Sequence, residues 1–77
     1  MTKAYILINI RTGEIHNVVR QLERVEGVID ANMTFGPYDA VAVVEANDIP
    51  HLGRILDTAI QPIPGVFETL TCLAVEN

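Results

Sequence analysis

The spacing of apolar residues changes period several times within 77 residues, and the order of these changes restricts the fold. Residues 4–10 form an apolar run rich in isoleucine, which is typical of a strand buried on both faces. Residues 14–26 repeat apolar side chains at helical spacing, whereas residues 28–35 alternate. Residues 39–46 predict a further strand, so the first half of the chain reads strand–helix–strand–strand.

Turn and capping residues indicate where these elements end. We expect Thr12 to cap the first helix and Gly27 to follow its last turn. A short hairpin at Gly36-Pro37 joins the second and third strands. Strict alternation in the second strand predicts that one face carries Ile29, Ala31, Met33 and Phe35, and that the other carries Val28, Asp30, Asn32 and Thr34.

The second half of the chain adds a helix and a strand. Asn47 or Asp48 caps the helix, and Pro50 lies in its first turn, where a missing N–H costs little. Residues 62–65 end this helix, and residues 66–75 predict the last strand. The resulting order is that of a ferredoxin-like βαββαβ fold. This α+β fold has a four-stranded antiparallel sheet with two helices on one face, and its first and third strands are central.

The other face of this sheet would be open, and it is also apolar. Tyr5 and Leu7 alternate with Ile6 and Ile8 along the first strand. A chain this short buries only about 60–65% of the surface that it exposes when unfolded. Cys72 has no partner for a disulfide that would compensate. We therefore expect the open face to pack on a second copy, in a two-fold dimer of the dimeric α+β barrel type.

Charge and composition exclude several classes of function. Ten acidic and five scattered basic residues give a net charge of −5, so direct binding to nucleic acid is disfavoured. We expect no signal peptide, because the first residues lack a long apolar segment, and no apolar run reaches the ~20 residues that span a bilayer. One free cysteine fits a reducing compartment. We expect a single cytoplasmic domain over residues 1–77.

Few residues offer chemistry for catalysis or metal binding. Serine is absent, and His16, His51 and Cys72 lack neighbours at ligand or catalytic spacing, so no metal or cofactor is expected. A small enzyme of the dimeric α+β barrel type remains an alternative. It would use groups that point into a pocket between the helices and the sheet, for which Tyr5, Asn9 and His16 are the candidates.

The hairpin offers a candidate ligand site. Gly36 allows a ligand to approach main-chain N–H groups closely, and Tyr38 adds an apolar ring with a polar end. Asp39 can accept an ammonium group, so these residues suit a zwitterion. The alternative is that they only form a tight turn, with Asp39 accepting backbone hydrogen bonds.

Three elements of the sequence resemble the C-terminal effector-binding (RAM) domain of Lrp/AsnC transcription regulators. Gly36-Pro37-Tyr38-Asp39 is similar to the G-x-[YF]-D element that opens the family's third strand. Residues 64–71 are similar to its P-G-V-x-x-T-x-T element at the fourth strand, and residues 27–28 to its G-V entry to the second. These elements occur in the family's order and extend over essentially the whole chain.

This resemblance implies an amino-acid-binding module rather than an enzyme. The family's domains dimerise through the sheet, assemble into rings such as tetramers of dimers, and bind amino acids where dimers meet. The resemblance assigns ligand binding to Met33, Phe35, Gly36, Pro37, Tyr38, Asp39, Gln61, Thr69, Thr71 and Cys72.

The regulators also carry a helix-turn-helix domain, for which no residues precede the first strand here. The start at Met1 favours a stand-alone form. Such a form would act as a metabolite sensor or co-assemble with a full-length regulator. A ligand-free assembly element is the other alternative to an amino-acid sensor.

Overall fold

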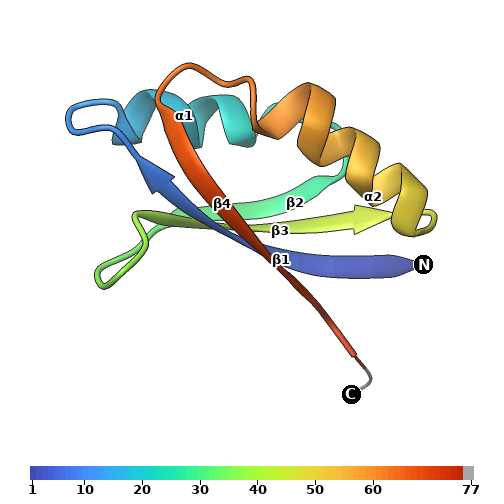
Figure 1. Cartoon of the computed structure of the whole chain (residues 1–77). Helices are drawn as coiled ribbons and strands as arrows, with labels where there is room; N and C mark the ends of the chain where they lie inside the picture. Colours follow the sequence, from blue (N-terminus) through green and yellow to red (C-terminus); the bar gives the residue numbers. More distant parts are fainter. Residues whose placement is uncertain (76–77) are drawn as a thin grey trace.

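Four strands and two helices follow each other in the predicted order (Figure 1). The computed structural model describes residues 1–75. The strands are β1 (Thr2–Ile10), β2 (Val28–Met33), β3 (Ala40–Ala46) and β4 (Val66–Leu73), and the helices are α1 (Ile15–Leu22) and α2 (Ile49–Ile55), the latter continuing as a π-helical turn (Leu56–Ile60).

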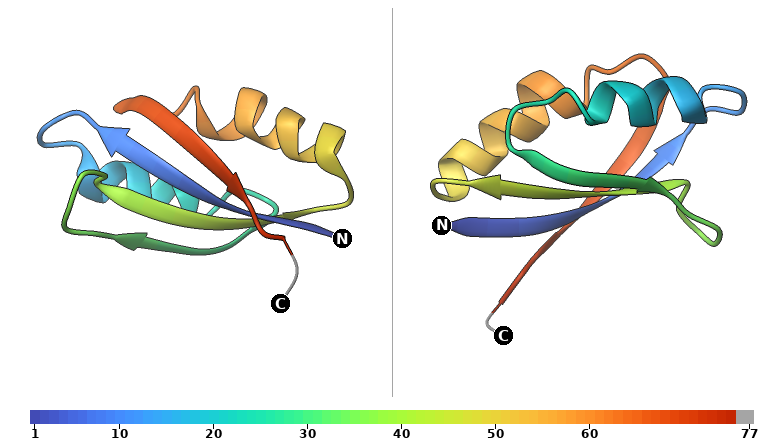
Figure 2. Two further views of the ribbon diagram at one scale, coloured as in Figure 1. Left: turned by 60° about the horizontal axis from the view of Figure 1, so that its bottom comes forward. Right: turned by 180° about the vertical axis from the view of Figure 1, so that it is seen from behind.

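The strands form one antiparallel sheet in the order β2-β3-β1-β4, which confirms that the first and third strands are central. Both helices lie on the same side of this sheet (Figure 2). Ile6 and Ile8 of β1 are fully buried on the helix side, next to Val44 of β3. Val18 and Leu22 of α1 pack into the same core, because the apolar stripe of the helix faces the sheet.

The first helix is shorter than the sequence predicted. It begins after Glu14, which is its N-cap without a side-chain hydrogen bond, so the prediction that Thr12 caps it is wrong. It ends at Leu22, and the chain then tightens: Arg24 N–H and Val25 N–H donate three residues back, the latter to the Leu22 carbonyl at 3.1 Å. Gly27 therefore lies in the turn before β2, with φ +101°, and does not directly follow the helix.

The second helix begins as predicted and ends, as predicted, before Pro62, but its last turn is not α-helical. Asp48 caps it by accepting a hydrogen bond of 2.8 Å from His51 N–H, and Pro50 lies in the first turn. The last turn widens into a π-helix, in which Gln61 N–H donates to the Leu56 carbonyl at 2.9 Å. Ile60, the last residue of this turn, is fully buried.

The faces that strict alternation predicted for β2 are wrong, because a β-bulge lies between Val28 and Asp30. Val28 pairs with Val44 and Ala31 with Ala42, so Val28 and Ala31 both lie on the helix side. Strict alternation had placed these two residues on opposite faces. The strand ends at Met33, two residues earlier than predicted, and β4 ends at Leu73 rather than at residue 75.

No helix among residues 1–75 covers the second face of the sheet (Figure 2). Tyr5 and Leu7 of β1 lie on it, beside Val43 of β3 and Leu70 of β4. In the same part of the chain, neither helix is long and apolar enough to cross a membrane. The predicted open apolar face is therefore present.

We predict that Gly65→Ala destabilises the fold more than Gly13→Ala does. Both glycines have positive φ, +101° and +89°, so both alanines would be strained. Only at Gly65 would the added Cβ also lie 2.8 Å from Glu14 Cβ and 3.1 Å from Val18 Cγ2. We expect an additional loss of about 1–3 kcal/mol, measured by urea unfolding. Equal losses for the two variants would show that α1 does not constrain the start of β4.

Candidate ligand-binding site

Asp39 links the β2–β3 hairpin to the central strand. Its N–H donates to the Ile8 carbonyl at 2.9 Å, and its own carbonyl accepts from Thr34 N–H at 3.0 Å. Its carboxylate Oδ2 accepts from Ile10 N–H at 2.7 Å. The carboxylate therefore continues the β1–β3 ladder past the last paired residues and fixes the direction of the side chain. Because Ile10 bonds to Oδ2, Oδ1 is left as a second acceptor.

The rest of the hairpin is open to solvent. Gly36 has φ +129°, and no atom lies within 4 Å of the position that a Cβ would take. The Thr34 hydroxyl donates to the Tyr38 carbonyl at 2.8 Å, which closes the turn. Phe35 is fully exposed and Pro37 is exposed, while Tyr38 is half-buried. A small molecule or a second copy of the chain therefore has free access to the hairpin.

A hollow of about 330 Å³ lies between the hairpin and α1. Three of the predicted site residues, Met33, Phe35 and Asp39, line it together with Thr34. The sequence did not predict the remaining wall, which is Ile15 at the start of α1. Ile15 was recognised only as part of the helical apolar stripe, since one sequence does not show which element lies beside the hairpin.

The remaining candidates lie at the other edge of the sheet. Gln61 Nε2 donates to Thr69 Oγ1 at 3.3 Å, and both residues line a hollow of about 290 Å³ with Phe67 and Glu68. Thr71 and Cys72 do not line this hollow. Thr71 pairs with Ile6 and lies on the helix side, whereas Cys72 pairs with Tyr5 and lies on the open face.

The two groups of candidates share one row across the sheet. Met33 pairs with Ala40, Ala40 with Ile8, and Ile8 with Thr69. Three strand spacings separate the ends of this row, or about 14 Å. One copy of the chain therefore does not bring the hairpin and β4 candidates into a single pocket.

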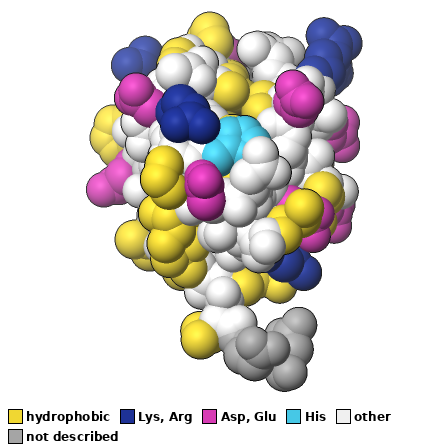
Figure 3. Space-filling view, turned by 90° about the vertical axis from the view of Figure 1, so that its right-hand side faces the viewer, with side chains coloured by type: hydrophobic (Ala, Val, Ile, Leu, Met, Phe, Trp, Pro, Cys, Tyr) yellow, Lys and Arg dark blue, Asp and Glu magenta, His cyan; other side chains and the backbone are white. Residues whose placement is uncertain are grey.

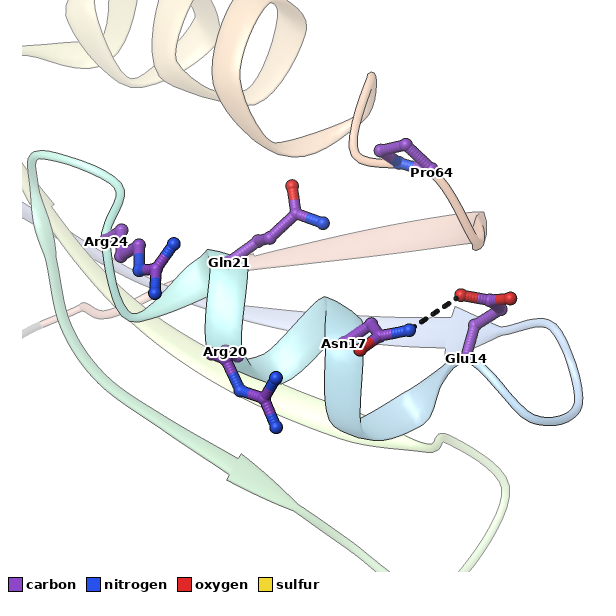
Figure 4. A pocket seen from close by; sticks show the side chains of 6 residues that line it. All are labelled: Glu14, Asn17, Arg20, Gln21, Arg24 and Pro64. Carbon is purple, nitrogen blue, oxygen red and sulfur yellow. Dashed lines mark hydrogen bonds between the residues drawn. The ribbon is translucent and has the colours of Figure 1, made fainter.

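Two larger hollows contain none of the predicted residues. One, of about 560 Å³, lies along the polar side of α1 and is bordered by Glu14, Asn17, Arg20, Gln21, Arg24 and Pro64. Gln21 points toward the loop that carries Pro64, whereas Arg20 points away from it (Figure 4). Asn17 Nδ2 donates to Glu14 Oε1 at 3.4 Å, so these side chains form a solvated helix face.

The other hollow, of about 420 Å³, lies between the turn before β2 and α2. His51 and Arg54 border it, and His51 Nδ1 accepts a hydrogen bond of 3.0 Å from Asn47 N–H. On the face that contains the start of α2, a histidine lies between basic and acidic side chains (Figure 3). Its hydrogen bond gives His51 a role in holding the start of α2.

The groups that the enzyme alternative requires are not brought together. Tyr5 and Asn9 lie on the open face of β1, and His16 is exposed on α1. None of these three residues lines any of the four hollows. Among residues 1–75, no three His, Cys, Asp or Glu side chains are grouped so that they could hold a metal ion.

The fold is that of a small ferredoxin-like α+β domain with an accessible hairpin between β2 and β3. Residues 3–77 match the family described as the Lrp/AsnC ligand binding domain, and the chain belongs to this family. It is 32% identical over 74 residues to the HTH-type transcriptional regulator FL11 of Pyrococcus abyssi, covering 96% of this chain and 48% of the regulator. The chain thus spans about half the length of this relative.

Two solved structures share the fold closely. TTHA0845 from Thermus thermophilus superposes with a TM-score of 0.95 at 28% identity, covering 100% of this chain and 96% of that chain. E. coli AsnC superposes with a TM-score of 0.93 at 25% identity, covering 99% of this chain and 52% of AsnC. TTHA0845 is therefore nearly the same length as this chain.

We predict that Asp39→Ala destabilises the protein more than Asp39→Asn does. Alanine leaves the largely buried Ile10 N–H without its acceptor, which costs roughly 1–3 kcal/mol. Asparagine retains a carbonyl oxygen at that place, so its loss should be less than about 1 kcal/mol. Urea unfolding of the three proteins measures both effects. Equal stability of Asp39→Ala and the unchanged protein would mean that the bond to Ile10 does not support the hairpin.

Proposed function

We propose that this Lrp/AsnC ligand-binding domain binds a free amino acid at the β2–β3 hairpin and acts as a cytoplasmic sensor. The observation that carries the proposal is the fixed Asp39 carboxylate, which keeps one oxygen unused beside an open hairpin. That oxygen suits an α-ammonium group, and the main-chain N–H groups near Gly36 suit an α-carboxylate. In this proposal Gly36, Pro37 and Tyr38 shape the main chain, and Met33 and Phe35 contact the ligand.

We also propose that the site is completed by a neighbouring copy. The second group of candidates, Gln61, Thr69 and Thr71, lies about three strands away, which is too far to reach the same ligand. The fully exposed Phe35 provides apolar surface for contact between copies. Cys72 lies on the other face of the sheet, so its proposed role moves from the ligand site to the dimer contact.

The proposed dimer forms through the open face of the sheet. Its centre is apolar and consists of Leu7, Val43 and Leu70. Its rim is polar: on adjacent strands, Lys3 lies opposite Glu45 and Asn9 lies opposite Glu68. An apolar centre with a polar rim is the usual composition of a stable interface. Such dimers would assemble further, with each other or with a full-length regulator of the family.

Binding without catalysis is the function that the side chains favour, since Tyr5, Asn9 and His16 are dispersed over two surfaces. A ligand-free assembly element is the second candidate. The hydrogen bond from Ile10 to Asp39 favours it, because that bond alone would explain an aspartate at this position.

Calorimetric titration with each of the twenty amino acids separates these candidates. We expect at least one to bind, and Asp39→Asn to weaken it at least roughly tenfold, because the variant keeps the bond to Ile10 and loses the negative charge. Asp57→Asn, which removes an exposed carboxylate from the π-helical turn, is the matched control and should bind normally. No heat of binding at millimolar concentration would favour the assembly element.

Light scattering tests the dimer. Leu70→Arg places a charge on the open face and should reduce the mass toward that of one chain, because an unpaired charge is costly in an interface. Leu70 and Ile49 are 48% and 60% exposed, so Ile49→Arg on α2 is the matched control, with unchanged mass. Circular dichroism confirms that both variants are folded. An unchanged mass for Leu70→Arg would place the interface elsewhere.

A further inference from the structure

We propose that the effector is an α-amino acid with an uncharged, apolar side chain, and that Ile15 and Met33 determine this preference. The inference rests on the proposed function, since it assumes that an amino acid binds at the hairpin. It assigns the ligand's side chain to the hollow of about 330 Å³ between the hairpin and α1. This volume lies near the lower limit of small-molecule sites, which span roughly 300–1,000 Å³.

Three different elements supply the apolar walls of this hollow. Ile15 comes from the first residue of α1, Met33 from the last residue of β2, and Phe35 from the hairpin. Ile15 is half-buried and packs against the core, so its wall is fixed. Met33 is unbranched and half exposed, which lets it adjust to ligands of different shape.

Apart from Asp39 Oδ1, which the proposal assigns to the ligand's ammonium group, few polar groups of the hollow are available to a ligand side chain. Thr34 and Asp39 are the two polar residues of its lining. The Thr34 hydroxyl donates to the Tyr38 carbonyl, and Asp39 Oδ2 accepts from Ile10 N–H. We assign the polar candidates of the neighbouring copy to the ligand's main-chain groups outside this hollow. Inside it, a ligand side chain with an amide or hydroxyl group would lose water and gain few partners, so it would bind more weakly than an apolar side chain of equal size.

Charge discriminates in the same direction. Asp39 is the one ionisable residue of the hollow, and it repels an acidic ligand side chain. A basic side chain would compete with the ligand's own ammonium group for Asp39 Oδ1, and its charge would be desolvated against Ile15 and Met33. Apolar side chains avoid both costs.

Calorimetry with ligands matched in size tests the preference directly. Leucine, asparagine and aspartate have nearly the same shape, and norleucine and glutamine have side chains of similar length. We expect leucine or norleucine to bind roughly tenfold or more tightly than its polar counterparts. Tighter binding of a polar or charged member would overturn the inference and leave the proposed function intact. Failure of every amino acid to bind would overturn both.

A pair of variants on one strand tests the location. Met33→Gln keeps the length of the side chain and makes the wall polar, so leucine or norleucine should bind at least roughly tenfold more weakly and the advantage over the polar ligand should shrink. Ile29 has similar exposure, 55% against 51% for Met33, and lies outside this hollow, so Ile29→Gln should bind normally. Equal affinity of Met33→Gln and the unchanged protein for every ligand would overturn the assignment of this hollow.

Discussion

The antiparallel pairing of β1 with β3 on one side and β4 on the other is the interaction on which the other elements depend. It fixes Ile6 and Ile8 in the core and directs Tyr5 and Leu7 to the opposite face. Two short helices cover the first face only. Residues 1–75 supply no further element for the second face, so the apolar side chains there are accessible to another copy.

The same strand connects the fold to the candidate site. The ladder between β1 and β3 ends at Ile8 and Ala40, and Asp39 extends it through hydrogen bonds to Ile8 and Ile10. The carboxylate therefore has a structural role and a free acceptor at once. These two roles do not exclude each other, because a carboxylate accepts several hydrogen bonds. A side chain held in this way loses little conformational freedom when a ligand binds, which favours affinity.

Much of the fold was predictable because its signals are local. Apolar spacing located all four strands and both helices, and the prediction that Asn47 or Asp48 caps the second helix is confirmed for Asp48. The errors occurred where tertiary contacts determine the backbone. The early end of α1 at Leu22 and the bulge near Val28 both depend on how the chain enters the sheet. No local preference ends the helix at Leu22 or interrupts the strand near Val28. The sequence pattern alone therefore favoured a longer helix and an uninterrupted strand.

The sequence by itself determined the order of the elements, the two apolar faces of the sheet and the residue types of the hairpin, since each depends on neighbours along the chain. Only the tertiary structure decided which of the candidate residues meet. Strand order placed Met33 and Thr69 at opposite edges of the sheet, and side-chain alternation placed Thr71 and Cys72 on opposite faces. Packing of α1 brought Ile15 to the hairpin. These relations join residues far apart in the chain, so they arise only when the sheet has formed.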